Sequence, residues 1–312
     1  MIRFLKHSEI DPEKWNQTVR NSLFSSVFSE YKMLDLLTAP DTWHVLVQED
    51  YEAVMPLPTR KKGVLKYVYT PFFMPQMGIF SEREITSEET NAFLNEISKH
   101  YVLADVLLNE KNGIRKSHDT NFVSHTLSLQ PDYTELYSLF HENTKRNIKV
   151  GKKMECRVTV GEESVTDIIA LFRKNRGQAE AVHYHDYDYK VLKNVANYLL
   201  EKGLLDIYGV RTNDSRLAAG ALFVKDGNRR WFWFSGRDNQ LSACKPMFLL
   251  LDAYIRDHAG SALLLDFNGS KNENVARLYQ GFGGIRYTIP FARRFKNRFW
   301  KMVLALFVDG IG

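Results

Sequence analysis

The sequence predicts a mixed α/β (α+β) protein of two domains, each built from a mixed sheet flanked by helices. The chain has 312 residues, which is more than one small core accommodates. Short apolar runs of strand length alternate with segments of helical periodicity in both halves. The order hairpin, strand, helix, strand, helix, strand recurs loosely, so we place the two domains at residues 1–128 and 129–312.

Composition limits the class of protein. Hydrophobic residues make up 44% and charged residues 25%, as in a soluble globular protein. The net charge of +5 permits an anionic ligand, such as a phosphate-bearing cofactor, a nucleic acid or an anionic membrane, without specifying one. No stretch approaches the ~18 apolar residues of a membrane span, and no signal peptide is evident. Only Cys156 and Cys244 are present, without metal-ligand spacing, so we expect a cytoplasmic protein.

In the first domain, capping and periodicity predict a compact mixed sheet with helices. Asp11 followed by Pro12 is typical of a helix start. A second helix is expected through residues 27–37, and a third, capped by Ser87, from Ser87 to His100. Strands are predicted at 43–48, 53–58, 63–69 and 103–109. Residues 71–78 form an aromatic, proline-stiffened loop, and its Gln76 is a candidate for contacts to a donor or acceptor.

The second domain begins with a helix that opens at Pro131-Asp132 and is expected to continue to Lys153. Hairpin turns at Asn213-Asp214 and Asp226-Gly227 join successive strands. The remaining pattern predicts strands at 156–160, 205–211, 217–225, 230–235 and 287–291, and helices at 164–175, 187–202 and 246–258.

The segment 263–270 is the most informative stretch. Its apolar run predicts a strand buried on both faces, and Ser270 with Glu273 forms a capping box that begins a helix. The polar turn containing Asp266, Asn268 and Ser270 therefore lies where a buried strand opens toward a helix N-terminus, a usual place for a ligand. A strand-to-helix turn without chemistry fits the same pattern.

Two basic segments are candidates for binding an anion. The loop after the strand 230–235 carries Arg237 and Lys245 and leads into a helix N-terminus. A helical run from Lys145 and Arg146 to Lys153 forms a basic stripe. Ordinary solvated surface explains both segments equally well.

Two further segments invite a functional interpretation. The run His183 to Tyr189 contains ligand types for zinc or iron, but no second cluster supplies a matching ligand, so we expect no metal. We instead expect Tyr184 to shape an acceptor pocket, with Asp186 or Asp188 capping the next helix. The basic, aromatic tail 293–308 suits weak contact with an anionic membrane or nucleic acid, although packing on its own sheet is the preferred interpretation.

No nucleophile elbow, phosphate-cradling lysine loop, dinucleotide fingerprint or zinc spacing is present, which disfavours hydrolases, kinases and dehydrogenases. The segments 143–149, 266–270 and 281–283 together resemble the Fem-type peptidoglycan aminoacyltransferases and their relatives, the double GNAT-like bacterial acyltransferases. The similarity is clearest over about 132–290, and the first half looks like the variant N-terminal domain of that group.

The resemblance implies two tandem GNAT-like domains and transfer of an acyl or aminoacyl group from an activated donor to an amine, such as one on a lipid-linked cell-envelope precursor. It implies a splay between the strands at 230–235 and 263–267, where the donor's amide arm pairs with an exposed strand edge. The loop 236–245 lacks the glutamine or arginine and the glycines usual in acetyl-CoA users, so the donor is either acyl-CoA or aminoacyl-tRNA. A non-catalytic binding protein on the same fold is a further alternative.

The resemblance also suggests site residues. Asp266 is the candidate general base or amine-orienting group, and Tyr279 stands where Fem-type enzymes often carry a lysine. A tyrosine hydroxyl can donate to an oxyanion but supplies no fixed positive charge. Lys145 and Arg146 match the basic helix of the family and are expected to contact an anionic donor or acceptor.

Overall fold

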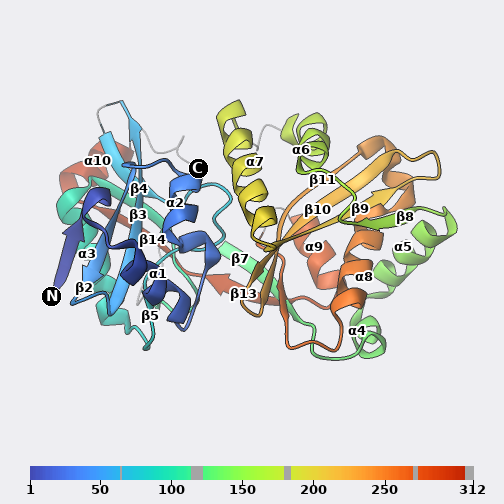
Figure 1. Ribbon diagram of the computed structural model, residues 1–312, viewed down its shortest axis with the longest axis horizontal. Coiled ribbons are helices and arrows are strands. Elements are labelled where there is room, and N and C mark those ends of the chain that lie inside the picture. Colours follow the sequence, from blue (N-terminus) through green and yellow to red (C-terminus); the bar gives the residue numbers. More distant parts are fainter. Residues whose placement is uncertain (64, 114–121, 179–183, 270–272, 306–312) are drawn as a thin grey trace. The chain divides into compact units, whose positions relative to one another are not determined.

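The computed structural model describes residues 1–63, 65–113, 122–178, 184–269 and 273–305, which form two compact units (Figure 1). The first unit contains Met1–Phe122 and Thr288–Gly312, and the second contains Val123–Tyr287. Each unit is a mixed sheet flanked by helices, so the predicted fold class is confirmed.

The first unit has the sheet order β1-β2-β3-β4-β6-β14, with β5 paired to β3. All its pairings are antiparallel except that of β4 with β6. Helix α1 packs against β3 and β5, and α3 packs against β2, β6 and β14. The elements are β1 (Ile2–Leu5), α1 (Pro12–Asn21), α2 (Tyr31–Leu37), β2 (Trp43–Gln48), β3 (Ala53–Lys62), β4 (Leu65–Tyr69), β5 (Phe80–Ser81), α3 (Ser87–His100), β6 (Leu103–Leu107), β14 (Phe291–Phe295) and α10 (Arg298–Ala305).

The second unit has the sheet order β13-β7-β12-β11-β10-β9-β8, with β11 and β12 parallel. Its elements are β7 (Phe122–Ser128), α4 (Tyr133–Leu139), α5 (Glu142–Lys153), β8 (Arg157–Val160), α6 (Val165–Lys174), α7 (Asp186–Glu201), β9 (Leu205–Arg211), β10 (Leu217–Asp226), β11 (Arg229–Arg237), α8 (Pro246–His258), β12 (Leu264–Asp266), α9 (Glu273–Gly281) and β13 (Ile285–Ile289).

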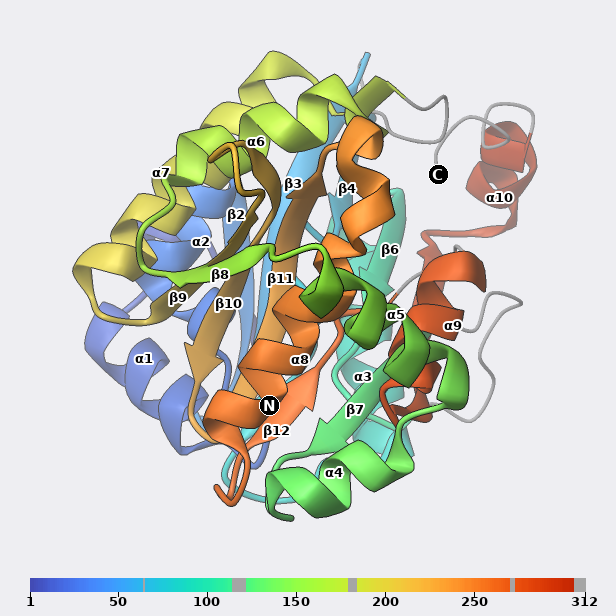
Figure 2. The same cartoon turned by 90° about the vertical axis from the view of Figure 1, so that its right-hand side faces the viewer.

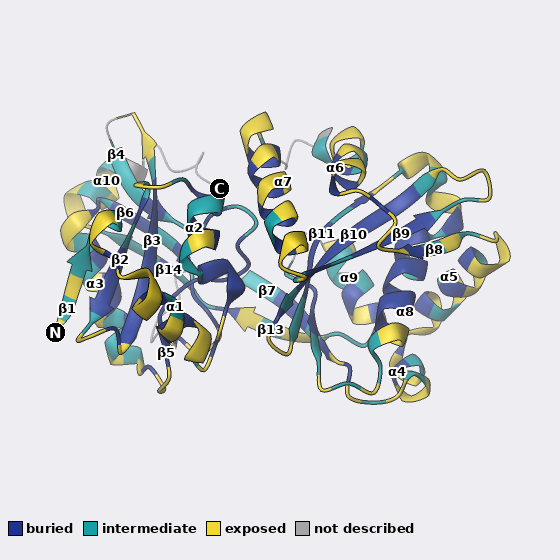
Figure 3. Ribbon diagram, viewed as in Figure 1, coloured by how far each residue is buried: buried dark blue, intermediate teal, exposed yellow. Residues whose placement is uncertain are grey.

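The second sheet is covered on both faces. Figure 2 shows α8 across one face and α6 and α7 over the other. On the α8 face, Phe223, Phe232 and Leu265 join residues of α8 and α9 in one apolar core. On the α6 face, Gly220 and Gly236 pair across β10 and β11, and a Cβ on either would lie 2.5 Å from an atom of Ile168. These glycines therefore allow α6 to lie directly on the sheet, and Figure 3 shows β10 and β11 as largely buried strands.

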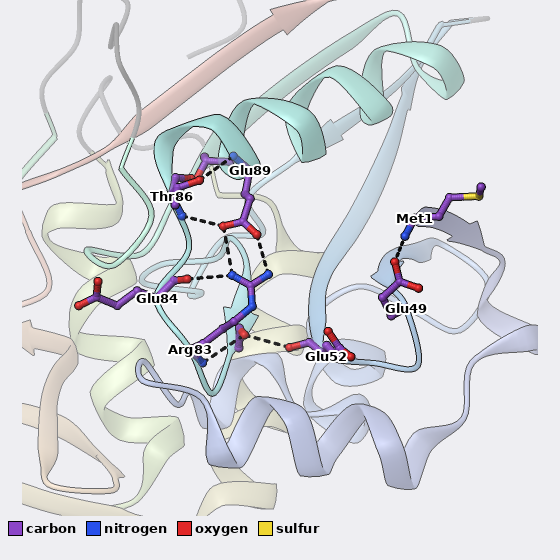
Figure 4. A network of polar contacts seen from close by, with 9 residues as sticks. Met1, Glu49, Glu52, Arg83, Glu84, Thr86 and Glu89 are labelled. Atoms are coloured by element: carbon purple, nitrogen blue, oxygen red, sulfur yellow. Dashed lines mark hydrogen bonds and ion pairs between the residues drawn. The ribbon is translucent and has the colours of Figure 1, made fainter.

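Several predicted elements match the structure closely. Asp11 caps α1 through hydrogen bonds from the Glu13 and Lys14 N–H groups, and α8 spans the predicted range from Pro246. The cap of α3 is Thr86 and not Ser87, because the Thr86 hydroxyl accepts the Glu89 N–H while Glu89 accepts the Thr86 N–H. Arg83 donates twice to the Glu89 carboxylate, at 2.6 and 3.1 Å, and so joins the cap to β5 (Figure 4).

Three predictions are corrected by backbone breaks or by long-range pairing. Glu30 is extended and separates a short 3₁₀ turn from α2, and Phe140 and His141 are extended and separate α4 from α5. The strand expected at 287–291 is two strands, of which β13 joins the second sheet and β14 joins the first. The division into units differs from the predicted boundary at 128/129 because β7 pairs with β12 of the second sheet and β14 pairs with β6 of the first.

Candidate functional site

The strands β11 and β12 of the second unit separate after three residue pairs. The parallel register runs from Arg229↔Leu264 to Trp231↔Asp266 and ends there. Strand β11 continues to Arg237 in register with β10, whereas the chain after β12 follows β7, because the Phe267 N–H donates to the His125 carbonyl at 2.9 Å. Strands β11 and β12 therefore diverge beyond Trp231, at the place where the splay is predicted.

A β-bulge lies at this edge. On β10 the consecutive residues Leu222 and Phe223 pair with Phe234 and Phe232, so that Trp233 is the extra residue of β11. A bulge bends its strand and redirects the peptide groups beside it. The Asn268 side-chain amide lies 3.5 Å from the Trp233 carbonyl, which brings the bulge and the turn after β12 together.

The turn after β12 is formed by two left-handed residues. Asn268 has φ of 58° and Gly269 has φ of 65°, conformations that asparagine and glycine adopt most readily. The Asn268 N–H donates to Asp266 Oδ1 at 2.9 Å, and the Gly269 N–H donates to Ser124 Oγ at 2.7 Å. The turn is thus held in place by β7 and by the last residue of β12.

Asp266 is fully buried and its two oxygens accept four hydrogen bonds. Oδ1 accepts from Ser124 Oγ at 2.8 Å and from the Asn268 N–H, while Oδ2 accepts from Arg229 at 2.9 Å and from the Tyr287 hydroxyl at 2.6 Å. Burial raises the pKa of Asp266 above its ordinary value, although Arg229 and the hydrogen bonds oppose that shift. This geometry favours a carboxylate that positions the turn over one that accepts a proton from substrate.

Tyr279 lies on the core side of α9 beneath the turn. Its ring stacks on Phe267, with centroids 4.6 Å apart and planes inclined by 18°, and also contacts His125. Burial raises the pKa of Tyr279 well above its ordinary value, so the phenol stays protonated at neutral pH and can act only as a hydrogen-bond donor or acceptor. Within the described part of the chain, its hydroxyl has no hydrogen-bond partner.

The loop between β11 and α8 leaves few backbone donors at the helix N-terminus. Lys245 has φ of 51° and caps α8, and Pro246 at the first helical position has no N–H. The N–H groups of Phe248 and Leu249 both donate to the Lys245 carbonyl, at 3.0 and 3.3 Å. A diphosphate group would therefore find fewer free N–H groups here than at an ordinary helix start.

The loop also contains Cys244, which is buried. Burial, with a smaller contribution from Cys156, raises the pKa of Cys244 to about 12. The thiol is thus protonated at neutral pH and unsuited to act as a nucleophile.

The other predicted site residues belong to other elements or lie outside the described residues. Lys145 pairs with Glu142 at 3.0 Å, and Arg146 donates to Asn143 at 2.7 Å, both on α5. Arg237 ends β11 and is exposed. Tyr184 packs beside Phe172 of α6 and Tyr189 of α7. Gln76 is buried in the first unit, and Ser270 lies outside the described residues.

The run His183 to Tyr189, for which no metal is expected, is described only from Tyr184 onward, because His183 lies outside the described residues. Asp188 accepts the His185 N–H at 2.8 Å and so caps α7, as predicted. Among the described residues, no three His, Cys, Asp or Glu side chains are grouped as metal ligands would be.

Three partners of Asp266 were not anticipated from the sequence. Ser124, Arg229 and Tyr287 come from β7, β11 and β13, and two of them are more than 30 residues from Asp266 in the chain. The run Leu263 to Phe267 gave one usable signal, since a carboxylate inside an otherwise apolar strand requires polar partners.

The first unit has a parallel pair at the corresponding place, but its gap is closed. Strands β4 and β6 pair at Val68↔Ala104 and Tyr69↔Asp105. The Thr70 hydroxyl then accepts the Leu107 N–H at 2.8 Å, and the Met77 N–H donates to the Leu107 carbonyl at 2.9 Å. The segment after β4 therefore occupies the edge of β6.

Fold, splay and family comparison agree on the class of protein. Residues 138–273 match the family model described as an acetyltransferase (GNAT) domain, so the second unit carries a GNAT-type acyltransferase domain. No curated protein sequence matches the chain. The predicted acyltransferase class is confirmed at the level of this GNAT domain.

Solved structures extend the match to the whole chain. FemX superposes with a TM-score of 0.65 at 12% identity, covering 95% of this chain and 98% of that chain. L-PGS from Bacillus licheniformis gives 0.57 at 11% identity, with 97% of each chain covered. A tandem GNAT protein from the clavulanic acid biosynthesis pathway gives 0.53 at 9% identity, covering 95% of this chain and 99% of that chain. These likenesses support two GNAT-like domains in tandem.

No helix among the described residues is long and apolar enough to cross a membrane.

Proposed function

We propose that the second unit binds an activated acyl donor along β11 beyond Trp231, where the pairing of β11 with β12 ends, and transfers its acyl group to an amine. The single observation that supports this most is the register of β11 with β12, which stops at Trp231↔Asp266 while β11 continues to Arg237. An extended amide arm can bind beside a strand whose pairing with its neighbour has ended, because the arm adds hydrogen bonds to the sheet.

In the proposed reaction the acceptor nitrogen attacks the acyl carbonyl carbon. The new C–N bond forms as the C–S bond of an acyl-CoA, or the ester C–O bond of an aminoacyl-tRNA, breaks. The proton lost by the amine ends on the leaving sulfur or oxygen. We assign the Tyr279 hydroxyl as the hydrogen-bond donor to the oxyanion, because it is protonated at neutral pH and has no competing partner among the described residues.

Asp266 has a positioning role in this proposal. Its carboxylate fixes Asn268 and, through Ser124, Gly269, and these residues border the gap. The Asn268 side-chain amide is placed beside the bulge carbonyl and is a second candidate for contact with the donor. Positive charge for an anionic donor or acceptor is assigned to Lys145, Arg146, Arg237 and Lys245, and acceptor contacts to Tyr184. Gln76 belongs to the first unit, and its contact with a donor or acceptor stays a prediction.

Aminoacyl-tRNA is the second candidate donor, and the α8 N-terminus favours it. Pro246, which has no N–H, and the Phe248 N–H, which donates to the Lys245 carbonyl, together remove two of the N–H groups that would bind a CoA diphosphate. A charged tRNA would be recognised mainly by cations and would bind with strong salt dependence. We assign the acceptor to amines of lipid-linked envelope precursors or small metabolites, and the location to the cytoplasm, where the free thiols Cys156 and Cys244 are stable.

The role assigned to Tyr279 is tested by comparing two tyrosine-to-phenylalanine variants, each of which loses one buried hydroxyl group. Tyr279→Phe keeps the stacking on Phe267 and should lower acyl transfer about 100-fold, as loss of one oxyanion donor does. Tyr254→Phe removes another buried hydroxyl, which lies on α8 and is stacked on Phe223, and should leave transfer unchanged. Transfer is measured with acetyl-CoA and with charged tRNA against a panel of amines. Equal activity of the two variants would remove the role assigned to Tyr279, and transfer from neither donor would favour a binding protein.

A further inference from the structure

Helix α10 of the first unit exposes two large apolar side chains. Phe299 is 64% exposed and Met302 is 73% exposed. Residues three apart lie on the same face of a helix, so the two side chains form one small apolar patch. Arg298 and Lys301 are exposed on the same short helix and flank this patch with positive charge.

Strand register brings a second basic segment to the same end of the first sheet. Ala104 of β6 pairs with Val68 of β4 on one side and with Arg294 of β14 on the other. Strand β3 leaves the sheet toward its hairpin with β4 at the end where β14 leads into α10. Lys61 and Lys62 of the hairpin therefore lie at the same sheet end as Lys296, Arg298 and Lys301. We call these five residues the basic end.

The basic end has features that its own fold does not require. Lys61 is directly opposite Lys66 in the β3–β4 register, and like charges placed opposite one another destabilise a hairpin. Residues 53–69 and 290–305 contain no Asp or Glu, so neither segment supplies a neutralising carboxylate. Lysines on the hairpin and cations beside exposed apolar residues are, however, the combination that binds an anionic lipid surface.

We propose that the basic end and α10 dock on an anionic lipid bilayer. Phe299 and Met302 enter the headgroup region, and the five cations contact lipid phosphates while their aliphatic stems lie along the apolar boundary. The apolar patch distinguishes this partner from a nucleic acid, which offers a stacking surface to Phe299 but no apolar environment to Met302.

The test is co-sedimentation of the full chain with phosphatidylcholine vesicles that contain or lack phosphatidylglycerol. We expect binding only when the anionic lipid is present, and weaker binding as salt is added. Lys61→Gln with Lys62→Gln should lower the partition coefficient about 30-fold, since each cation near a charged surface contributes about fivefold. Phe299→Ser with Met302→Ser should lower it at least 10-fold.

The matched control removes two exposed cations from α7. Lys190→Gln with Lys193→Gln changes the net charge equally and should leave vesicle binding unchanged, while thermal unfolding shows that all variants fold. Equal binding to neutral vesicles, equal loss in the α7 control, or no loss on changing Phe299 and Met302 would overturn the proposal. Absence of vesicle binding together with tRNA binding that needs the same residues would assign the surface to nucleic acid instead.

Discussion

The two units share an order of elements but differ where their parallel strands meet. Both units contain, in order, a strand, two helices, three antiparallel strands, a helix and a parallel strand. In the first unit these are β1 to β6 without β5, with α1 to α3, and in the second they are β8 to β12 with α6 to α8. In both units the last parallel pair joins an aromatic residue to an aspartate, Tyr69↔Asp105 and Trp231↔Asp266. Beyond that pair, the segment after β4 of the first unit bonds to β6, whereas in the second unit the described register of β11 with β12 ends.

The two aspartates show how this difference is built. Asp105 forms a bidentate pair with Arg293 directly across the β6–β14 ladder, both distances being 2.6 Å. Asp266 instead accepts hydrogen bonds from Arg229 of β11, from the Tyr287 hydroxyl of β13 and from the Asn268 N–H of the turn after β12. An aspartate thus links two paired strands in the first unit, whereas in the second unit it fixes the turn at which β12 diverges from β11.

The largest expected effect is on the stability of the second unit. Asp266→Ala leaves Arg229, whose side chain is 12% exposed, without its carboxylate, and should lower the free energy of unfolding by about 3–5 kcal/mol. Asp105→Ala frees Arg293, which is 29% exposed, and should cost only about 1 kcal/mol. Denaturant unfolding measures both losses in the free energy of unfolding. Similar losses would contradict the different roles assigned to the two carboxylates.

In the first unit, the hydrogen bonds that hold the segment after β4 should contribute to the stability of the protein but not to acyl transfer. Asn112 accepts the Ile79 N–H at 2.7 Å and donates to the Ile79 carbonyl at 3.1 Å, and all of these groups are buried. Asn112→Ala should therefore destabilise the protein by about 1–3 kcal/mol. Turnover per folded molecule should not change. A specific loss of transfer would mean that the first unit takes part in the chemistry.

Loss of the turn amide should affect transfer more than stability. Asn268→Gly retains the left-handed backbone and removes the side-chain amide beside the Trp233 carbonyl. We expect turnover to fall about 10-fold while the free energy of unfolding changes by less than about 1 kcal/mol. Gly269→Ala is the useful contrast, because it strains the backbone at φ of 65° and should destabilise the turn. Unchanged turnover in Asn268→Gly would show that the Asn268 side chain makes no functional contact with the donor.

The smallest effect concerns acid sensitivity of the first unit. Hydrogen bonds from Arg83 lower the pKa of Glu89 from 4.5 to about 2. A depressed pKa adds stability that is present above the ordinary pKa and is lost as pH falls through about 2. Arg83 is 46% exposed, so the contribution is below about 1 kcal/mol. Glu89→Gln should flatten the pH dependence of unfolding between these values, and an unchanged slope would exclude this cap as its source.

The sequence predicted features that depend on neighbours in the chain. Asp11 before Pro12, the hairpin at Asp226-Gly227 and the helix from Pro246 all follow from local capping, turn and periodicity rules, and all are present. The break at Phe140 and His141 was missed because apolar periodicity continued across it while the cap at Asp132 served only the first helix.

Long-range pairing limited the rest of the prediction. Nothing near residues 291–295 indicates that β14 joins β6, nearly 190 residues earlier in the chain, since pairing between distant strands leaves no local pattern. Likewise Asp266 was identified as a polar residue in an apolar strand, but Ser124, which is 142 residues away, and Tyr287 could be found only from the fold.

Amide hydrogen exchange on the full chain tests the difference between the units most directly. With acetyl-CoA or charged tRNA bound, we expect slower exchange at residues 232–237 of β11 and no change at residues 70–79, whose segment already occupies the first gap. Slower exchange at 70–79 alone, or equal slowing in both segments, would contradict a donor site confined to the open edge of the second sheet.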